Sequence, residues 1–200
     1  MPIRILTLYN RYRISTERVI MIAIFLAEGF EVCEALTQID LLRRARLDIK
    51  SFSITDSKDV LSSHGVVVKS DGNWSDFENE KDTCEAVILP GGTKGSENLG
   101  NFAPLCDFIK QLNSEGKLCC AICAAPTVFG KNGILNSKNY TCFPGFESPE
   151  FGGNYTGESF AHDGNIITGR AMNSSVDFAR EIIKTLAPDK LQDVDYGIQY

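Results

Sequence analysis

The stretch Leu118-Cys119-Cys120-Ala121-Ile122-Cys123-Ala124-Ala125-Pro126 decides the fold that we expect for this chain. Leu118–Ile122 is a short apolar run typical of a buried strand, and the alanines that follow favour a helix. Pro126 fits the first turn of that helix, because the N–H groups there have no helical partners. Cys123 is therefore predicted to lie on an elbow between a strand and a helix.

The rest of the chain repeats this alternation of strands and helices. We expect strands at Val19–Leu26, Asp48–Ile54, Glu85–Leu89, Leu118–Ile122 and Asn165–Thr168. We expect helices at Glu31–Ala45, Ala103–Ser114, Ala124–Lys131 and Ser174–Leu186. Ser62–Lys69 is predicted to be an extra strand or hairpin arm, and Asp163-Gly164 a hairpin turn. This order predicts an α/β fold, a three-layer sandwich with a mostly parallel sheet and helices on both faces.

Size and charge limit the function classes. A chain of 200 residues, 43% of them hydrophobic, suffices for one domain. Its net charge of -6, with acids and bases interspersed, favours neither nucleic acid nor an anionic membrane as a partner. We expect no leader peptide and no membrane span, and hence a cytoplasmic protein. Most of the seven cysteines are interpreted as buried small hydrophobic residues rather than disulfide partners.

The two ends of the chain differ from the domain that we predict at residues 21–187. Residues 1–20 are rich in arginine and are interpreted as an N-terminal extension. Three origins for it stay open: sequence appended before a natural start at Met21, an arginine-rich targeting segment, or an added edge strand at Ile3–Leu8. Residues 188–200 are polar and are expected to form a tail.

Three segments that are distant in sequence are predicted to meet at one edge of the sheet. Strands of a parallel sheet end at the same edge, and ligands bind in the crevice there. Glu31 and Glu34 follow the first strand, Gly91-Gly92 follows the strand at Glu85–Leu89, and Cys123 follows Leu118–Ile122. We therefore expect a glutamate, a glycine loop and a thiol to lie together.

This group of residues suits nucleophilic chemistry. A helix N-terminus lowers the pKa of a cysteine, which makes Cys123 a candidate nucleophile. The backbone N–H groups of Gly91, Gly92 and Ala124 are candidates for an oxyanion hole. Burial would raise the pKa of Glu34 and suit it to general acid–base work. The alternatives are a buried core cysteine, a tight glycine turn, and a solvated acid in a first helical turn.

Three motifs occur here in a fixed order: Ala27-Glu28-Gly29-Phe30-Glu31 with Glu34, Leu89-Pro90-Gly91-Gly92, and Ala121-Ile122-Cys123-Ala124-Ala125-Pro126. Together they resemble the ThiJ/PfpI superfamily, in particular the branch of the Parkinson-disease protein deglycase and its bacterial relatives. The resemblance implies a flavodoxin-like sandwich and a homodimer. It also implies a cysteine nucleophile, Cys123, hydrogen-bonded by a protonated glutamate, Glu34, with Gly92 and Ala124 lending N–H groups.

The chain departs from the family where other members carry a catalytic histidine. Ala124 stands directly after the cysteine, and Phe143-Pro144 stands where a histidine would precede a proline. The two histidines, His64 and His162, are interpreted as structural or solvated, which disfavours a Cys-His mechanism. As candidate pocket residues we name Glu31, His64, Phe143, Pro144 and Arg170.

No cofactor and no metal are expected. The glycines at 91–95 lack nucleotide-binding spacing, and no Cys, His and carboxylate group has zinc spacing. Cys120 and Cys123 form a C-x-x-C, but Cys120 should lie inside the strand, out of disulfide reach.

The resemblance implies a cofactor-free enzyme that acts on reactive carbonyls, either by converting methylglyoxal or glyoxal to the hydroxy acid or by deglycation. The alternative is a redox sensor or chaperone-like stress protein in which Cys123 is oxidised to the sulfinic acid. A third possibility is a protein that binds a small metabolite without chemistry.

Overall fold

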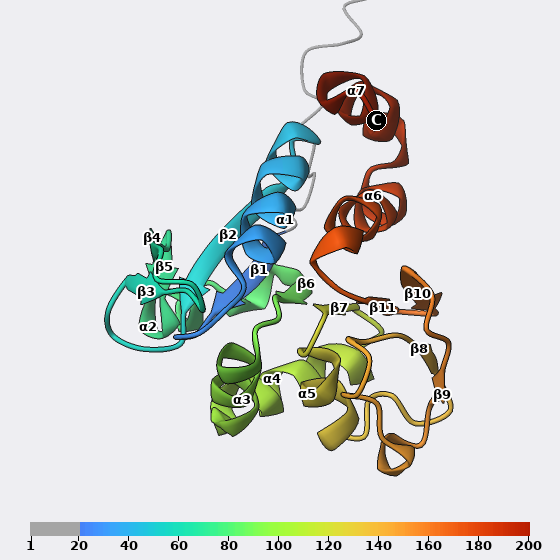
Figure 1. The fold of residues 1–200 in the computed structure, drawn as a ribbon. Helices are drawn as coiled ribbons and strands as arrows, with labels where there is room; N and C mark the ends of the chain where they lie inside the picture. Colours follow the sequence, from blue (N-terminus) through green and yellow to red (C-terminus); the bar gives the residue numbers. More distant parts are fainter. Residues whose placement is uncertain (1–20) are drawn as a thin grey trace, which may run out of the picture.

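A seven-stranded sheet forms the centre of the molecule, shown by a computed structural model that describes residues 21–200 (Figure 1). Its strand order is β10-β11-β7-β6-β1-β2-β5. The strands are β1 (Met21–Leu26), β2 (Asp48–Ser53), β5 (Gly72–Asn73), β6 (Cys84–Leu89), β7 (Leu118–Ile122), β10 (Phe160–Asp163) and β11 (Ile166–Gly169). All neighbours pair in parallel except β10 and β11. This arrangement confirms the predicted α/β class.

Helices cover both faces of the sheet (Figure 1). One face carries α1 (Val32–Arg44) and α6 (Ser175–Leu186), and the other carries α3 (Thr93–Asn101), α4 (Ala103–Ser114) and α5 (Pro126–Lys131). Two shorter helices are α2 (Trp74–Glu78) and α7 (Leu191–Ile198). Small paired strands lie outside the main sheet: β3 (Asp59–Leu61) with β4 (Val67–Lys69), and β8 (Asn139–Tyr140) with β9 (Asn154–Tyr155).

The two faces of the sheet belong to two hydrophobic cores. In β1 every residue is buried, with Met21, Ala23 and Phe25 in one core and Ile22, Ile24 and Leu26 in the other. Side chains of a strand alternate between faces, so a strand buried on both sides is apolar throughout. The apolar runs recognised in the sequence are therefore the central strands.

The structure confirms both hairpins. Residues 59–69 form an antiparallel pair of strands, and β10 joins β11 through a turn in which Gly164 has φ +66°. The predicted strand at Val19–Leu26 is seen from Met21 onward, and the interpretations of residues 1–20 fall outside the described part of the chain.

Three helices differ from the sequence expectation, and the short α2 (Trp74–Glu78) is one that no pattern predicted. Helix α3 was not predicted either, because two glycines and many polar residues hide its apolar periodicity. Gly95 is needed in this helix, since a Cβ atom on it would lie 2.7 Å from the Phe30 backbone.

The prediction of a polar tail at residues 188–200 was wrong. That segment forms α7, which buries Val194 and is held by two hydrogen bonds of 2.7 and 2.9 Å from Arg180 to Asp195.

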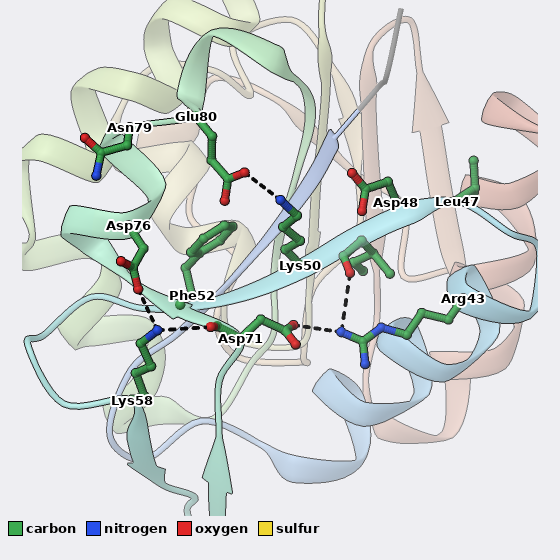
Figure 2. Close-up of a pocket in the computed structure, with 12 residues that line it drawn as sticks. Arg43, Leu47, Asp48, Lys50, Phe52, Lys58, Asp71, Asp76, Asn79 and Glu80 are labelled. Carbon is green, nitrogen blue, oxygen red and sulfur yellow. Dashed lines mark hydrogen bonds and ion pairs between the residues drawn. The ribbon is translucent and has the colours of Figure 1, made fainter. Parts of the chain in front are cut away.

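Polar side chains cover the edge of the sheet beside β2 (Figure 2). Strand β5 pairs only with Phe52 and Ser53 of β2. On the side away from β1, the start of β2 therefore has no neighbouring strand among residues 21–200. Asp71 accepts hydrogen bonds from both Ser51 N and Ser51 Oγ at 2.8 Å, and Arg43 donates to Asp71 at 2.7 Å. Asp71 thus takes the place of a strand carbonyl and protects the edge from pairing with another chain.

The protonation state of Asp71 follows from the same contacts. Burial acts to raise its pKa, but the hydrogen bonds from Ser51 and the charge of Arg43 outweigh burial, so the pKa is lowered. A carboxyl group with a lowered pKa stabilises the fold above its unfolded pKa, and this contribution is lost as the pH falls through the folded pKa.

We expect Asp71→Ala to destabilise the protein by about 1–3 kcal/mol, because it leaves the Ser51 N–H and the Arg43 guanidinium without their acceptor. Urea unfolding at pH 7 measures the change. Asp107→Ala, which removes an exposed carboxylate paired with Lys110, is the matched control and should change stability little. Equal stability of the two variants would contradict the proposed role of Asp71.

Candidate active site

Cys123 lies in the turn between β7 and α5, in a backbone conformation that is rare for a residue with a side chain. Its φ is +65°, in the left-handed region. Backbone hydrogen bonds hold it from two sides: Cys123 N donates to Gly169 O at 2.9 Å, and Phe143 N donates to Cys123 O at 2.8 Å. Such a conformation persists only where the surroundings determine it, and it turns the half-buried thiol toward the strand ends.

Glu34 lies in the first turn of α1 and is fully buried. Its carboxylate Oε2 accepts a hydrogen bond of 2.9 Å from Gly91 N. Glu31 caps the same helix, because its Oε2 accepts from Glu34 N at 2.7 Å while its own N donates to Gly91 O at 2.9 Å. Both backbone groups of Gly91 are thus bound to the start of α1.

Gly91 and Gly92 are glycines because no side chain fits at either position. A Cβ atom on Gly91 would lie 2.5 Å from both Cys123 Cβ and Glu34 Oε2. Gly92 has φ +88°, and a Cβ atom on it would lie 2.3 Å from Gly29 O. The absence of these two side chains lets the thiol and the carboxyl group approach each other.

The backbone N–H groups near Cys123 divide into two roles. The N–H groups of Gly92 and Ala124 act to lower the pKa of the Cys123 thiol. Gly91 N–H is taken by Glu34, which removes Gly91 from the N–H groups available to an oxyanion. Among the three candidates for the oxyanion hole, Gly92 and Ala124 are therefore the pair that faces the thiol.

Burial dominates the acidity of both side chains. It raises the pKa of Glu34 to about 7, against the hydrogen bonds from Cys123 and Gly91. Burial, followed by the charge of Glu34, also raises the pKa of Cys123 to about 12, whereas the Gly92 and Ala124 N–H groups act to lower it. The expectation of a lowered cysteine pKa was wrong, because a helix N-terminus does not offset burial beside a carboxylate.

The two groups consequently share one proton over a wide pH range. Above pH 7 the pair holds a single proton, as carboxylate with thiol or as carboxylic acid with thiolate. Glu34 Oε1 is buried and has no hydrogen-bond partner within residues 21–200. A proton on the carboxyl group would give the sulfur a donor in place of a negative charge, and the two N–H groups favour that form.

The candidate pocket residues differ in whether they contact Cys123 or Glu34. Glu31 supports Glu34 directly, and Phe143 is bonded to Cys123 through its backbone, with an exposed ring next to exposed Pro144. Arg170 follows β11 and donates to Gly157 O at 3.1 Å. His64 lies in the hairpin turn, exposed, with Nδ1 2.9 Å from Ser63 Oγ.

Neither histidine is hydrogen-bonded to the thiol. His162 lies on β10 and contacts Glu181 at 2.8 Å and Gly164 O at 3.0 Å. Cys120 is fully buried within β7, and burial raises its pKa well above the ordinary value. All seven cysteines are free thiols. Residues 21–200 contain no group of three or more His, Cys, Asp or Glu side chains placed to hold a metal ion, and no helix in them is long and apolar enough to cross a membrane.

Sequence reasoning missed the backbone groups that hold the elbow. These are the Gly169 carbonyl and the Phe143 N–H, and no side chain marks either of them. The Gly169 carbonyl could be predicted only from the register of β11 with β7, which pairs Gly169 with Ile122, the residue before Cys123.

A mostly parallel seven-stranded sheet with helices on both faces defines this chain as a flavodoxin-like α/β protein, and its site joins a cysteine elbow to a buried glutamate. The chain belongs to the DJ-1/PfpI family, whose model matches residues 20–185. It is 32% identical to protein dj-1beta of Drosophila melanogaster over 179 residues, which are 88% of this chain and 94% of that protein.

Solved structures agree with this assignment. A DJ-1 superfamily protein from Salmonella typhimurium superposes with a TM-score of 0.84 at 30% identity, covering 90% of this chain and 98% of that one. The oxidized DJ-1 of Toxoplasma gondii superposes with a TM-score of 0.83 at 29% identity, again covering 90% and 98%.

The shared proton predicts how Cys123 reacts with an alkylating agent. In the wild type, the rate should rise with pH up to about 7 and then level off, because the Glu34 charge that forms there opposes the thiolate. In Glu34→Gln no charge forms, so the rate should keep rising and exceed the wild-type rate above pH 7. Iodoacetamide labelling with peptide mass spectrometry measures both profiles.

Cys123→Ser serves as the control for labelling of the other six thiols, of which only Cys33 is exposed. Identical pH profiles for wild type and Glu34→Gln would show that Glu34 does not control the thiol.

Proposed function

We propose that this protein is a cofactor-free enzyme that converts small 1,2-dicarbonyl compounds to hydroxy acids through Cys123. The observation that carries the proposal is the Glu34 carboxyl group, whose pKa is raised to about 7 and which is hydrogen-bonded to Cys123 beside two N–H donors. A general acid–base group works best when its pKa lies near the working pH.

The reaction begins with attack of the Cys123 thiolate on the aldehyde carbon of methylglyoxal. A carbon–sulfur bond forms, and the carbonyl oxygen becomes an oxyanion that the N–H groups of Gly92 and Ala124 stabilise. A proton from solvent or Glu34 then gives the hemithioacetal.

Glu34 then moves a proton between the two carbon atoms. Its carboxylate removes the proton from the former aldehyde carbon and returns it to the neighbouring carbon, so that the first carbon is oxidised and the second reduced. The product is a thioester, which water hydrolyses to lactate and the free thiol. The sum is methylglyoxal plus water giving lactate, with no external oxidant or reductant.

Two substitutions test this mechanism in a methylglyoxal assay that measures lactate. Cys123→Ala removes the nucleophile, and Glu34→Gln keeps a hydrogen-bond donor but cannot carry the proton. We expect each to lower kcat/KM by at least about 100-fold, the lower range for loss of a general acid–base group.

The control is His162→Gln, which alters a histidine that lies on β10 and pairs with Glu181. It should retain wild-type turnover. Full activity in both Cys123→Ala and Glu34→Gln would rule the mechanism out. Loss of activity in His162→Gln would show that the mechanism requires a histidine.

A redox sensor is the second candidate function. One observation favours it: the related Toxoplasma gondii DJ-1 has been solved in a form described as oxidized. In this chain, two molecules of peroxide would each transfer one oxygen atom to Cys123 and leave as water, giving the sulfinic acid. The N–H groups of Gly92 and Ala124 and a protonated Glu34 would then donate to its oxygens.

Graded peroxide followed by peptide mass spectrometry tests this second function. Oxidation should begin at Cys123 and should not begin at Cys33, which is more exposed but lacks the surrounding donors. Oxidation that tracks exposure alone, with Cys33 first, would contradict it. The homodimer implied by the family resemblance stays a prediction.

A further inference from the structure

Helices α3 and α5 are neighbours on one face of the sheet (Figure 1). A cavity of about 310 Å³ is lined by residues of both helices and of the loop that carries Phe146. The lining residues are Thr93, Ser96, Glu97, Gly100, Asn101, Thr127, Val128, Lys131 and Phe146. The volume is at the lower end of the range for small-molecule sites.

Residues that line this cavity lie next to residues of the Cys123 site. Thr93 directly follows Gly92, and Thr127 Oγ1 donates to Ala124 O at 2.7 Å. The Phe146 ring packs edge-on against Phe143, whose N–H binds Cys123 O. Lining residues of the cavity are therefore linked directly to Gly92 and Ala124, although Gly92, Cys123 and Ala124 are not themselves part of its lining.

The lining is chemically suited to neutral hydroxyl groups. Thr93 and Ser96 carry hydroxyls and Asn101 carries an amide, each able to donate and accept hydrogen bonds. The Thr127 hydroxyl already donates to Ala124 O and is left as an acceptor. Ser96 is only 3% exposed, and its Oγ has no hydrogen-bond partner within residues 21–200. A buried polar atom without a partner is costly, and a ligand hydroxyl would supply the missing bond.

Charge at the cavity does not favour an ionic ligand. Glu97 and Lys131 both line it and are both exposed, so their opposite charges offset each other. The Phe146 ring adds an apolar surface on which the carbon skeleton of a polyol can lie.

We propose that this cavity binds the hydroxylated tail of a sugar-derived 1,2-dicarbonyl compound whose aldehyde carbon is attacked by Cys123. This inference rests on the proposed dicarbonyl chemistry and names the substrate class for it. The tail takes no part in bond making; its binding adds to kcat/KM only for substrates that are long enough to reach the cavity.

Gly100 provides a variant that fills the cavity. It lies within helix α3, and a Cβ atom on it would meet its nearest neighbour, Val128 Cγ2, at an ordinary 3.6 Å. Gly100→Leu should therefore keep the helix and occupy the space, whereas Gly100→Ala is the matched control that adds a single methyl group.

The experiment compares kcat/KM for 3-deoxyglucosone, which carries hydroxyls on its last three carbons, with that for methylglyoxal, which has no such tail. We expect Gly100→Leu to lower kcat/KM for 3-deoxyglucosone at least about tenfold, and Ser96→Ala to lower it roughly threefold to tenfold. Both variants should leave methylglyoxal turnover within about twofold, and Gly100→Ala should resemble the wild type.

A second measurement does not depend on turnover. Amide NMR shifts during titration with erythritol should change in α3 and α5 of the wild type and stay unchanged in Gly100→Leu. Wild-type turnover of methylglyoxal with no substrate-dependent effect of Gly100→Leu would overturn the cavity assignment alone. Absence of turnover on both substrates would overturn the proposed function, and absence of erythritol shifts would then reject the polyol site as well.

Discussion

The site depends on one close contact, the approach of Gly91 to both Cys123 and Glu34. Because Gly91 has no side chain, its backbone enters a space where a Cβ atom would lie 2.5 Å from each of them. Its N–H then binds Glu34 and its carbonyl binds Glu31. Gly91, which lies just after β6, thus connects the start of α1 with the turn after β7, and residues that follow three strands form one site.

The energetic consequence of this contact is a carboxyl group and a thiol that cannot both be charged. Burial raises the pKa of each group, and the charge of Glu34 further raises the pKa of Cys123. The fold bears the cost of burying Glu34, and in return the proton on the pair can move between oxygen and sulfur near neutral pH. The same proton would suit both functions proposed for this site, acid–base catalysis and stabilisation of an oxidised sulfur.

Rigid surroundings make this arrangement possible. The strained backbone of Cys123 is held by Gly169 on β11 and by Phe143 on the loop after β8. Both faces of the sheet below it are packed, so the strand ends have little freedom to move. At the far edge, Asp71 and Arg43 complete the hydrogen bonding of β2 where no strand covers it.

The sequence by itself determined the class of fold and the members of the site. Apolar runs such as Leu118–Ile122 identified the central strands, because a strand covered on both faces must be apolar, and the shared edge of a parallel sheet brought Glu34, Gly91 and Cys123 together. Local pattern failed at α3 and α7, whose helices depend on packing against Phe30 and Arg180 rather than on their own periodicity. Only the tertiary structure decided the pKa direction of Cys123 and the separate roles of Gly91 and Gly92, because burial and hydrogen-bond direction arise from groups far apart in the chain.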